Sequence, residues 1–390
     1  MSVPINVSAI NIRFEESDIH LVLTETERML REGRVSQGRW VEELELRMAQ
    51  LTGAPHSLAV SNGTVALELA FKALGLAGRR VAIPANTNFA TYIAAVNAGA
   101  RVALIDIDLT TLSPSLNQLK ALYLDTSSQS DPIAAVVLVH MGGIISREIL
   151  EIQSWCRANN IALVEDCAHA HGCSFEGVHA GMFGDAGCFS FFATKVVTSG
   201  EGGLIVTNSK QLETELRYLR NLGKKDLWRN YHERLGTNGR ISEFNALLGA
   251  VQVARIDEIA SERARLAERY CELLGHESLP ITIVKPSGSC SWYKFVILLP
   301  KAIDRDALRS KLLTEHGIQM SGCIYEYPLH QQPILAPLHT DERYPFAEDF
   351  CSRHMCLPLW PGLSYDAQKN VVDAFTQELG RCLNATQVRC

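Results

Sequence analysis

Short apolar runs alternate with helical patterns over the first two-thirds of the chain. The runs are rich in Val and Ile and lack a strict polar alternation, which is typical of strands buried on both faces of a parallel sheet. The predicted strands are Ser57–Val60, Arg80–Pro84, Arg101–Asp106, Ala134–His140, Ile161–Glu165, Gly187–Phe191 and Gly203–Thr207. The pattern therefore predicts an α/β fold in which helices flank a mainly parallel sheet of seven strands.

In the segments between these strands, apolar residues recur at the spacing of a helix. Thr64–Leu74 and Thr91–Ala98 are rich in Ala, and Ser146–Asn159 begins at a Ser that can cap a helix. A ligand would bind at the carboxyl ends of the strands in such a fold.

A longer helical stretch, from Ser242 to about Leu274, follows the last strand. The remaining sequence predicts a small α+β unit, with strands at Ile281–Val284 and Ser291–Leu299 and helices at Asp304–Glu315 and Ser364–Gly380. We expect a large domain over residues 1–255 and a small C-terminal domain over residues 256–390.

Composition and charge narrow the class of protein. Hydrophobic residues make up 47% of the chain and charged residues 21%, as in ordinary globular proteins. The formal net charge of −6 argues against a general nucleic-acid surface, which needs a basic footprint. The chain has no run of 18 apolar residues and no secretory signal over Met1–Phe14, so we expect no membrane span and a cytoplasmic location. The 11 Cys, an odd number without framework spacing, indicate reduced thiols.

The turn Val60-Ser61-Asn62-Gly63-Thr64 joins a predicted strand to a predicted helix. Gly63 lets the backbone approach a ligand closely, and the free N–H groups at a helix start attract an anion such as phosphate. Alone this turn is weak evidence, because any turn between a strand and a helix can contain a Gly.

Two acidic residues, Glu165 and Asp166, follow an apolar strand directly. A carboxylate at that edge of the sheet can pair with a protonated heterocyclic nitrogen, and such a pair makes the ring of pyridoxal phosphate (PLP) a better electron sink. Asp166 is the predicted partner, because Glu165 would face the opposite side in a strand.

The same segment also permits a metal site. Cys167, His169, His171 and Cys173 alternate, so an extended strand would bring them to one face, where they could bind zinc. Gly172 and the small residues around it favour a loop instead, and structural zinc sites usually have wider paired spacings. For each His alone, the commoner interpretation is a hydrogen-bonded, partly buried side chain.

Lys195 stands alone in an otherwise apolar stretch between Gly181 and Gly203. Partial burial would lower the pKa of its amine and free it for attack on a carbonyl carbon. Ser190, at the end of a predicted strand, can donate a hydrogen bond to a phosphate. A single Lys would be an ordinary surface residue at a hairpin, whereas the whole string indicates a lysine that carries a cofactor.

This string resembles the Lys-bearing signature of the DegT/StrS group of sugar aminotransferases, which are fold-type I PLP enzymes. The matching pieces are Gly184-Asp185, Phe189-Ser190-Phe191, Thr194-Lys195 and Gly200-Glu201-Gly202-Gly203. Four further segments resemble the family in order and approximate spacing, namely Gly38–Glu45, Ser61–Thr64, Glu165–Gly172 and Leu235–Glu243. The resemblance covers nearly the whole chain.

The resemblance implies roles around PLP. Lys195 would bind the cofactor as a Schiff base and later move a proton, while Asp166 would pair with the pyridine nitrogen. Gly63, Thr64 and Ser190 would hold the phosphate.

The resemblance also implies roles for His169 and Asn238. His169 would approach the phenolic oxygen of the cofactor, and Asn238 would reach the phosphate bound by the neighbouring subunit. The second role implies a homodimer with composite active sites.

One departure from the family concerns the residue that stacks on the cofactor ring. Where the family often has an aromatic residue, this chain has Asn88, with Phe89 next. Either Phe89 stacks through a shifted register or Asn88 lies over the ring, and we favour Phe89.

The expected reaction moves an amino group from glutamate or glutamine to a keto sugar, with a nucleotide-linked sugar as the commonest choice in the family. A keto-cyclitol and a free or phosphorylated sugar are the alternative acceptors. Dehydrating members of the family carry His in place of the Schiff-base Lys, so Lys195 argues against that reaction. A catalytically silent PLP-fold regulatory protein is the alternative of another class.

Overall fold

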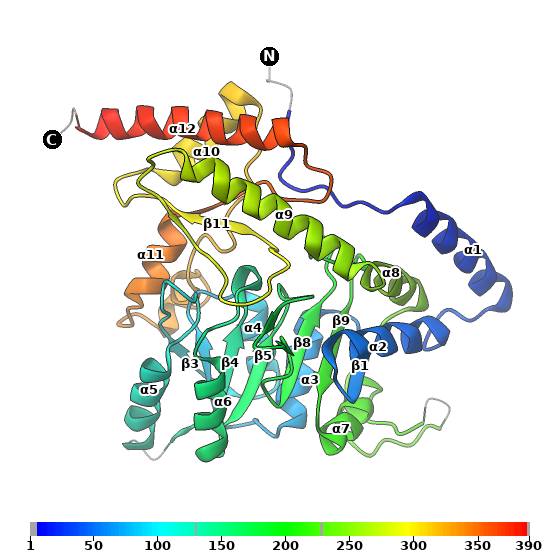
Figure 1. The fold of residues 1–390 in the computed structure, drawn as a ribbon. Coiled ribbons are helices and arrows are strands. Elements are labelled where there is room, and N and C mark those ends of the chain that lie inside the picture. The colour runs from blue at the N-terminus through cyan, green and yellow to red at the C-terminus, as the bar shows by residue number, and fades with distance from the viewer. Residues whose placement is uncertain (1–5, 129–130, 227–228, 388–390) are drawn as a thin grey trace.

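A seven-stranded sheet forms the centre of the computed structural model, which describes residues 6–128, 131–226 and 229–387. The strands are β1 (His56–Val60), β2 (Arg80–Pro84), β3 (Arg101–Ile105), β4 (Ile133–Val139), β5 (Ala162–Asp166), β8 (Ala186–Ser190) and β9 (Gly203–Thr207). Their order is β1-β9-β8-β5-β4-β2-β3 (Figure 1). Strand β9 runs antiparallel to both of its neighbours and the other pairs are parallel. The predicted fold class is confirmed.

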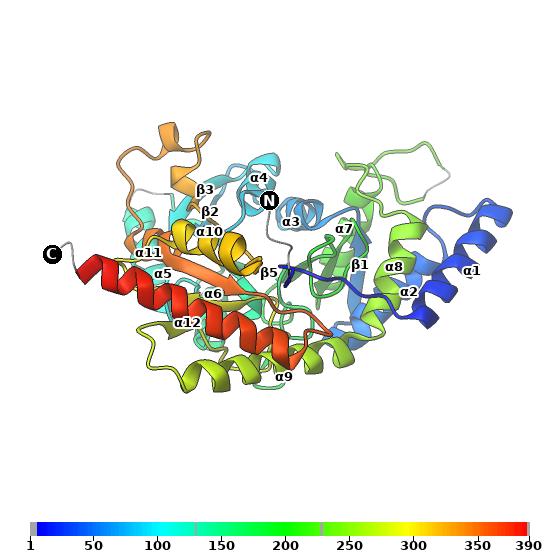
Figure 2. The ribbon, with the colours of Figure 1, turned by 90° about the horizontal axis from the view of Figure 1, so that it is seen from above.

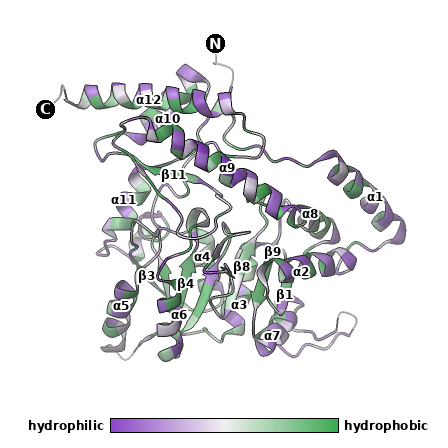
Figure 3. Cartoon of the chain, in the orientation of Figure 1, coloured by the Kyte–Doolittle hydropathy of each residue, from purple (hydrophilic) through white to green (hydrophobic). Residues whose placement is uncertain are grey.

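Helices cover both faces of this sheet, because side chains along each strand alternate between two apolar clusters. One cluster contains residues of α3 (Gly63–Ala73), α4 (Phe89–Asn97) and α7 (Lys210–Arg220). The other contains residues of α2 (Arg39–Thr52), α5 (Leu116–Ser128), α6 (Ile149–Ala158) and α8 (Glu243–Val253). Figure 3 shows the hydrophobic colour concentrated in the central strands. Helix α1 (Glu16–Glu32) projects from the edge of the molecule beside α8 (Figures 1 and 2).

The C-terminal part has a three-stranded antiparallel sheet, with β11 (Phe295–Leu298) between β10 (Thr282–Ile283) and β12 (His354–Leu357). Its helices are α9 (Ile256–Gly275), α10 (Arg305–His316), α11 (Pro345–Arg353) and α12 (Tyr365–Gln387). The start of the chain joins this part, since Val7 forms a bridge with Ile318. None of the helices within the described ranges is both long enough and apolar enough to cross a membrane. The division at residues 255/256 stays a proposal.

Two predicted helices differ from those observed. The single helix expected from Ser242 is two helices, α8 and α9, because the backbone of Arg255 leaves the helical region at φ −110° and ψ 12°. The side chain of Arg255 binds Asp18 of α1 at 2.9 Å. Helix α6 begins at Ile149 rather than at Ser146. The Ser146 hydroxyl instead accepts the backbone N–H of Glu148 at 3.3 Å.

Candidate active site

Three segments end at the same edge of the central sheet and form the walls of one cavity. Asp166 is the last residue of β5, Ser190 is the last residue of β8, and the turn after β1 leads into α3 at Gly63. Because β1, β5 and β8 all run in one direction, their carboxyl ends meet there. A cavity of about 460 Å³ lies at this edge, and Gly63, Thr64, Asp166, Ser190 and Lys195 all line it. The structure thus brings together these five residues predicted from the sequence.

The floor of the cavity is built for an anion. Asn62 caps α3 by accepting the N–H of Val65 at 2.9 Å, and the N–H groups of Gly63 and Thr64, in the first turn, have no acceptor within the helix. A Cβ atom at Gly203 would lie only 2.3 Å from the carbonyl carbon of Asn62, so a glycine is needed where β9 passes this turn. The positive end of the α3 dipole also faces the cavity. Together these groups form a cradle of the kind that holds a phosphate.

Asp166 lines the same cavity and is fixed by two hydrogen bonds. The hydroxyl of Thr91 donates to Oδ2 at 2.8 Å, and the backbone N–H of Ala168 donates to Oδ1 at 3.1 Å. Burial raises the pKa of Asp166, while these two hydrogen bonds and the charge of Lys195 lower it. Both carboxylate oxygens are therefore held in place beside the cavity, where a protonated ring nitrogen could pair with them.

Lys195 lies in the turn that follows β8, with its backbone N–H bonded to the carbonyl of Phe192 at 2.9 Å. Burial lowers the pKa of its ammonium to about 8, although the negative charge of Asp166 acts in the opposite direction. The Nζ atom lies 5.1 Å from the centroid of the Tyr293 ring. An amine with this pKa is partly neutral near neutral pH and can attack a carbonyl carbon.

Three other predicted residues lie outside the cavity lining. The His169 ring packs on Tyr293, with ring centroids 4.2 Å apart. Phe89 begins α4, and its ring stacks on that of Tyr92 with the ring centroids 6.1 Å apart. Asn88, in contrast, lines the cavity. Phe89 is partly exposed and is not among the residues that line the cavity, so its stacking role stays a prediction. Asn238 is exposed and does not line the cavity of its own chain.

The zinc alternative finds no support in the geometry. His169 stacks on an aromatic ring, and His171 packs against Phe189 and Phe191 at 5.2 and 5.0 Å. The Cys173 thiol lies 3.3 Å from the hydroxyl of Ser291. Within the described ranges, the groups close enough to share a metal are His140, Glu165 and Cys167, and Glu315, His316 and Glu378. The alternating Cys and His residues belong to a loop and do not converge.

Three aromatic and basic residues near Lys195 were not predicted from the sequence. Tyr325 lines the same cavity from the C-terminal part, and its hydroxyl accepts a hydrogen bond from the backbone N–H of Asn88. Tyr293 and Lys294 come from the segment that leads into β11. These residues are about 100 or more positions from Lys195 and lie in irregular segments, so no periodicity or spacing in the sequence could connect them to the site.

A family model for the DegT/DnrJ/EryC1/StrS aminotransferase family matches residues 18–376. The chain belongs to this family. It is a PLP-dependent aminotransferase. The fold-type I resemblance seen in the sequence is thus confirmed, as is the cofactor.

Relatives and solved structures agree with this assignment. The chain is 32% identical to a GDP-perosamine synthase of Vibrio cholerae over 342 residues, which cover 86% of this chain and 90% of the relative. It is 30% identical to a pleiotropic regulatory protein of Geobacillus stearothermophilus over 90% of this chain and 92% of the relative. A crystal structure of DesI in the presence of its TDP-sugar product superposes with a TM-score of 0.86 at 27% identity, covering 99% of this chain and 96% of that one.

The residues of the cavity fit PLP. The cradle at Gly63, Thr64 and Ser190 suits its phosphate, and Asp166 suits its ring nitrogen. Lys195 lines the same cavity and offers an amine suited to its aldehyde.

Proposed function

We propose that this aminotransferase moves the amino group of glutamate or glutamine to a keto sugar linked to a nucleotide, as a step in amino-sugar biosynthesis. The observation that carries the proposal is the convergence of Lys195, Asp166 and the anion cradle in one cavity. The similarity to a GDP-perosamine synthase and to a structure with a TDP-sugar product supports the choice of acceptor.

Bound PLP supplies an electrophilic carbon and a ring that takes up electrons. Asp166, held by Thr91 and Ala168, keeps the ring nitrogen protonated. The Nζ atom of Lys195 binds the cofactor at rest and, once released, carries a proton between the substrate carbon and the cofactor. A pKa of about 8 suits this task, because the amine can both take up and release a proton near neutral pH.

We also propose that His169 orients the cofactor through its phenolic oxygen. The backbone N–H of Gly142 donates to Nδ1 of His169 at 3.4 Å, which places the ring proton on Nε2. Burial holds the pKa of His169 well below its usual value, and the positive charges of Lys195 and Lys294 lower it further. The ring is therefore neutral and can donate one hydrogen bond from Nε2.

We infer that the enzyme is a homodimer with composite sites, in which Asn238 reaches the phosphate bound by the partner. Asn238 is exposed on the loop that precedes α8. Exposed Leu side chains on α1 and α2 offer apolar surface for a second copy, and they are Leu23, Leu30 and Leu46. Sedimentation of the purified protein tests this inference, and a monomer at micromolar concentration would overturn it.

The function is tested by following the colour of the PLP-loaded protein. We expect a yellow protein that bleaches on addition of glutamate or glutamine, and regains its colour when a keto-sugar nucleotide accepts the amino group. The acceptor screen should compare keto-sugar nucleotides with keto-inositols and with free or phosphorylated keto sugars. Recovery of colour only with one of the other acceptor classes would replace the nucleotide-linked sugar by that class.

The similarity to a protein named as a regulator keeps a second function in view. A catalytically silent PLP-fold regulator would bind PLP and remain yellow with every amino acid tested. The complete set of Lys195, Asp166 and Ser190 in one cavity favours the enzyme, because a protein that has lost catalysis does not need all three residues.

A further inference from the structure

A second cavity, of about 70 Å³, shares Lys195 with the first one. Its walls come from residues 9–15 near the start of the chain, the turn after β8, the end of α8 with the first half of α9, the segment leading into β11 and the loops after α10 and β12. Thr194, Tyr293, Lys294 and Ser321 are among the residues that line it. This small space therefore lies directly beside the amine that is expected to carry the cofactor.

Lys294 brings a second ammonium group to this space. Its Nζ atom donates to the carbonyl of Ser321 at 3.1 Å and lies 5.3 Å from the centroid of the Tyr293 ring. The Nζ atom of Lys195 lies 5.1 Å from the same centroid. Burial lowers the pKa of Lys294, and within the described ranges no carboxylate forms an ion pair with it. A partly buried cation that lacks an anion is costly unless a ligand supplies one.

The acidic residues that line this cavity are occupied elsewhere. Glu15 and Glu258 both pair with Arg255, at 3.6 and 2.7 Å. Glu262 accepts the backbone N–H of Gly362 at 2.7 Å. The positive charge beside Lys195 is thus not neutralised by the protein's own carboxylates, although three of them are near.

We propose that Lys294 binds the α-carboxylate of the amino-acid donor. This proposal rests on the proposed transamination. The donor's amino nitrogen must reach the place of Lys195 Nζ, and its α-carboxylate is attached to the same carbon as that nitrogen. An ammonium that packs on the same Tyr293 ring as Lys195 is placed to receive this carboxylate. Lys294 and Lys195 line the same cavity, so a carboxylate bound there lies beside the amine that the donor nitrogen replaces.

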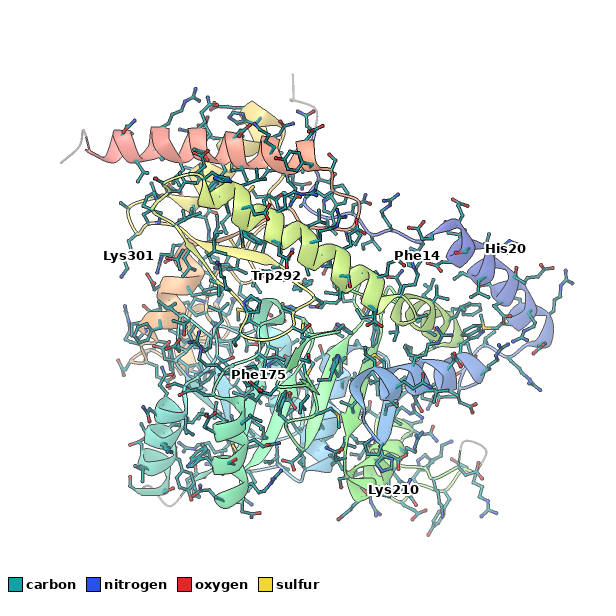
Figure 4. All side chains as sticks on the ribbon, viewed as in Figure 1. Phe14, His20, Phe175, Lys210, Trp292 and Lys301 are labelled. Atoms are coloured by element: carbon teal, nitrogen blue, oxygen red, sulfur yellow. The ribbon has the colours of Figure 1, made fainter. Side chains whose placement is uncertain are left out.

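The test compares three variants of the PLP-loaded enzyme. Lys294→Met removes the charge, Lys294→Arg keeps it, and Lys301→Met is the matched control. Lys301 lies on the same part of the chain with its side chain 82% exposed, and Figure 4 shows it at the edge of the molecule. The probe is 2-methylglutamate, a donor analogue with a methyl group in place of the α-hydrogen that transamination removes. Its dissociation constant is measured by calorimetry.

We expect Lys294→Met to weaken binding of 2-methylglutamate at least tenfold, the effect of losing a charge-assisted hydrogen bond. Lys294→Arg should lose less affinity for 2-methylglutamate than Lys294→Met does. Lys301→Met should bind 2-methylglutamate like the unmodified enzyme. Equal dissociation constants for all variants would overturn the proposal. If Lys294→Met does not fold, Lys294→Gln takes its place under the same criterion. Failure of the proposed function would look different, because the unmodified enzyme itself would then not take up PLP or respond to a donor.

Discussion

Gly63 lies so close to Ser190 that a Cβ atom at position 63 would come within 2.8 Å of the Ser190 Cβ. This contact joins the start of α3 to the end of β8, and it sets the shape of the anion cradle. A distance under 3.0 Å requires one of the two elements to move.

Gly63→Ala should therefore weaken PLP binding at least tenfold, because α3 must shift away from Ser190 and carry the N–H groups of the cradle with it. Fluorescence titration of the apo-protein with PLP measures this effect. Gly275→Ala is the control, since a Cβ at that position, at the end of α9, would meet no atom within 4 Å. An unchanged affinity in Gly63→Ala would show that the cradle does not hold the phosphate.

The rate at which the apo-protein captures PLP should depend on the protonation of Lys195. Only the neutral amine attacks, and burial brings the pKa of Lys195 down to about 8. The rate should thus rise with pH up to about 8 and level off above it, as stopped-flow absorbance would measure. The positive charge of Lys294 contributes to the lowering, so Lys294→Met should move the levelling point to higher pH. A rate that still rises through pH 10 would contradict this.

Tyr325 is expected to contribute its ring, rather than its hydroxyl, to the cofactor site. It lines the cavity with Asp166 and Lys195, and burial raises its pKa well above the usual value, so the phenol stays neutral. Tyr325→Phe should bind PLP within threefold of the unmodified protein, and Tyr325→Leu at least fivefold more weakly. The two variants should be compared by the same fluorescence titration. Equal affinity of the Phe and Leu variants would assign Tyr325 no part in cofactor binding.

Glu165 should matter for stability rather than for catalysis. Its carboxylate is fully buried and accepts the backbone N–H groups of Gly181, Phe183 and Gly184 at 2.8, 2.8 and 2.6 Å. Glu165→Gln keeps an acceptor on one side only and turns its NH2 group toward at least one of these backbone donors. It should cost about 2 kcal/mol, because a buried donor is left without an acceptor. We expect a fall of several degrees in the melting temperature, whereas Glu277→Gln, at an exposed site, should melt like the unmodified protein. Equal melting of both variants would refute this role.

The central sheet could be predicted from the sequence because its signals are local. Arg80–Pro84 and Gly203–Thr207 are apolar runs whose predicted bounds match β2 and β9. Asp166 and Ser190 lie at the ends of such runs, so their place at the carboxyl edge of the sheet could be inferred together with the strands.

The features that were missed depend on contacts between distant segments. The break between α8 and α9 falls at Ala254 and Arg255, both good helix formers, and a contact with Asp18 of α1 accompanies it. Tyr325 and Lys294 reach the site only because the C-terminal part folds over the large sheet. No pattern within a short window contains that information.

The most direct test of the account is to find which lysine carries the cofactor. The PLP-loaded protein is reduced with borohydride, which fixes the bond between the lysine and the cofactor, and is then digested and analysed by mass spectrometry. We expect the added mass on the peptide that contains Lys195 and nowhere else. The added mass on the peptide that contains Lys294, or on any other lysine, would contradict the account.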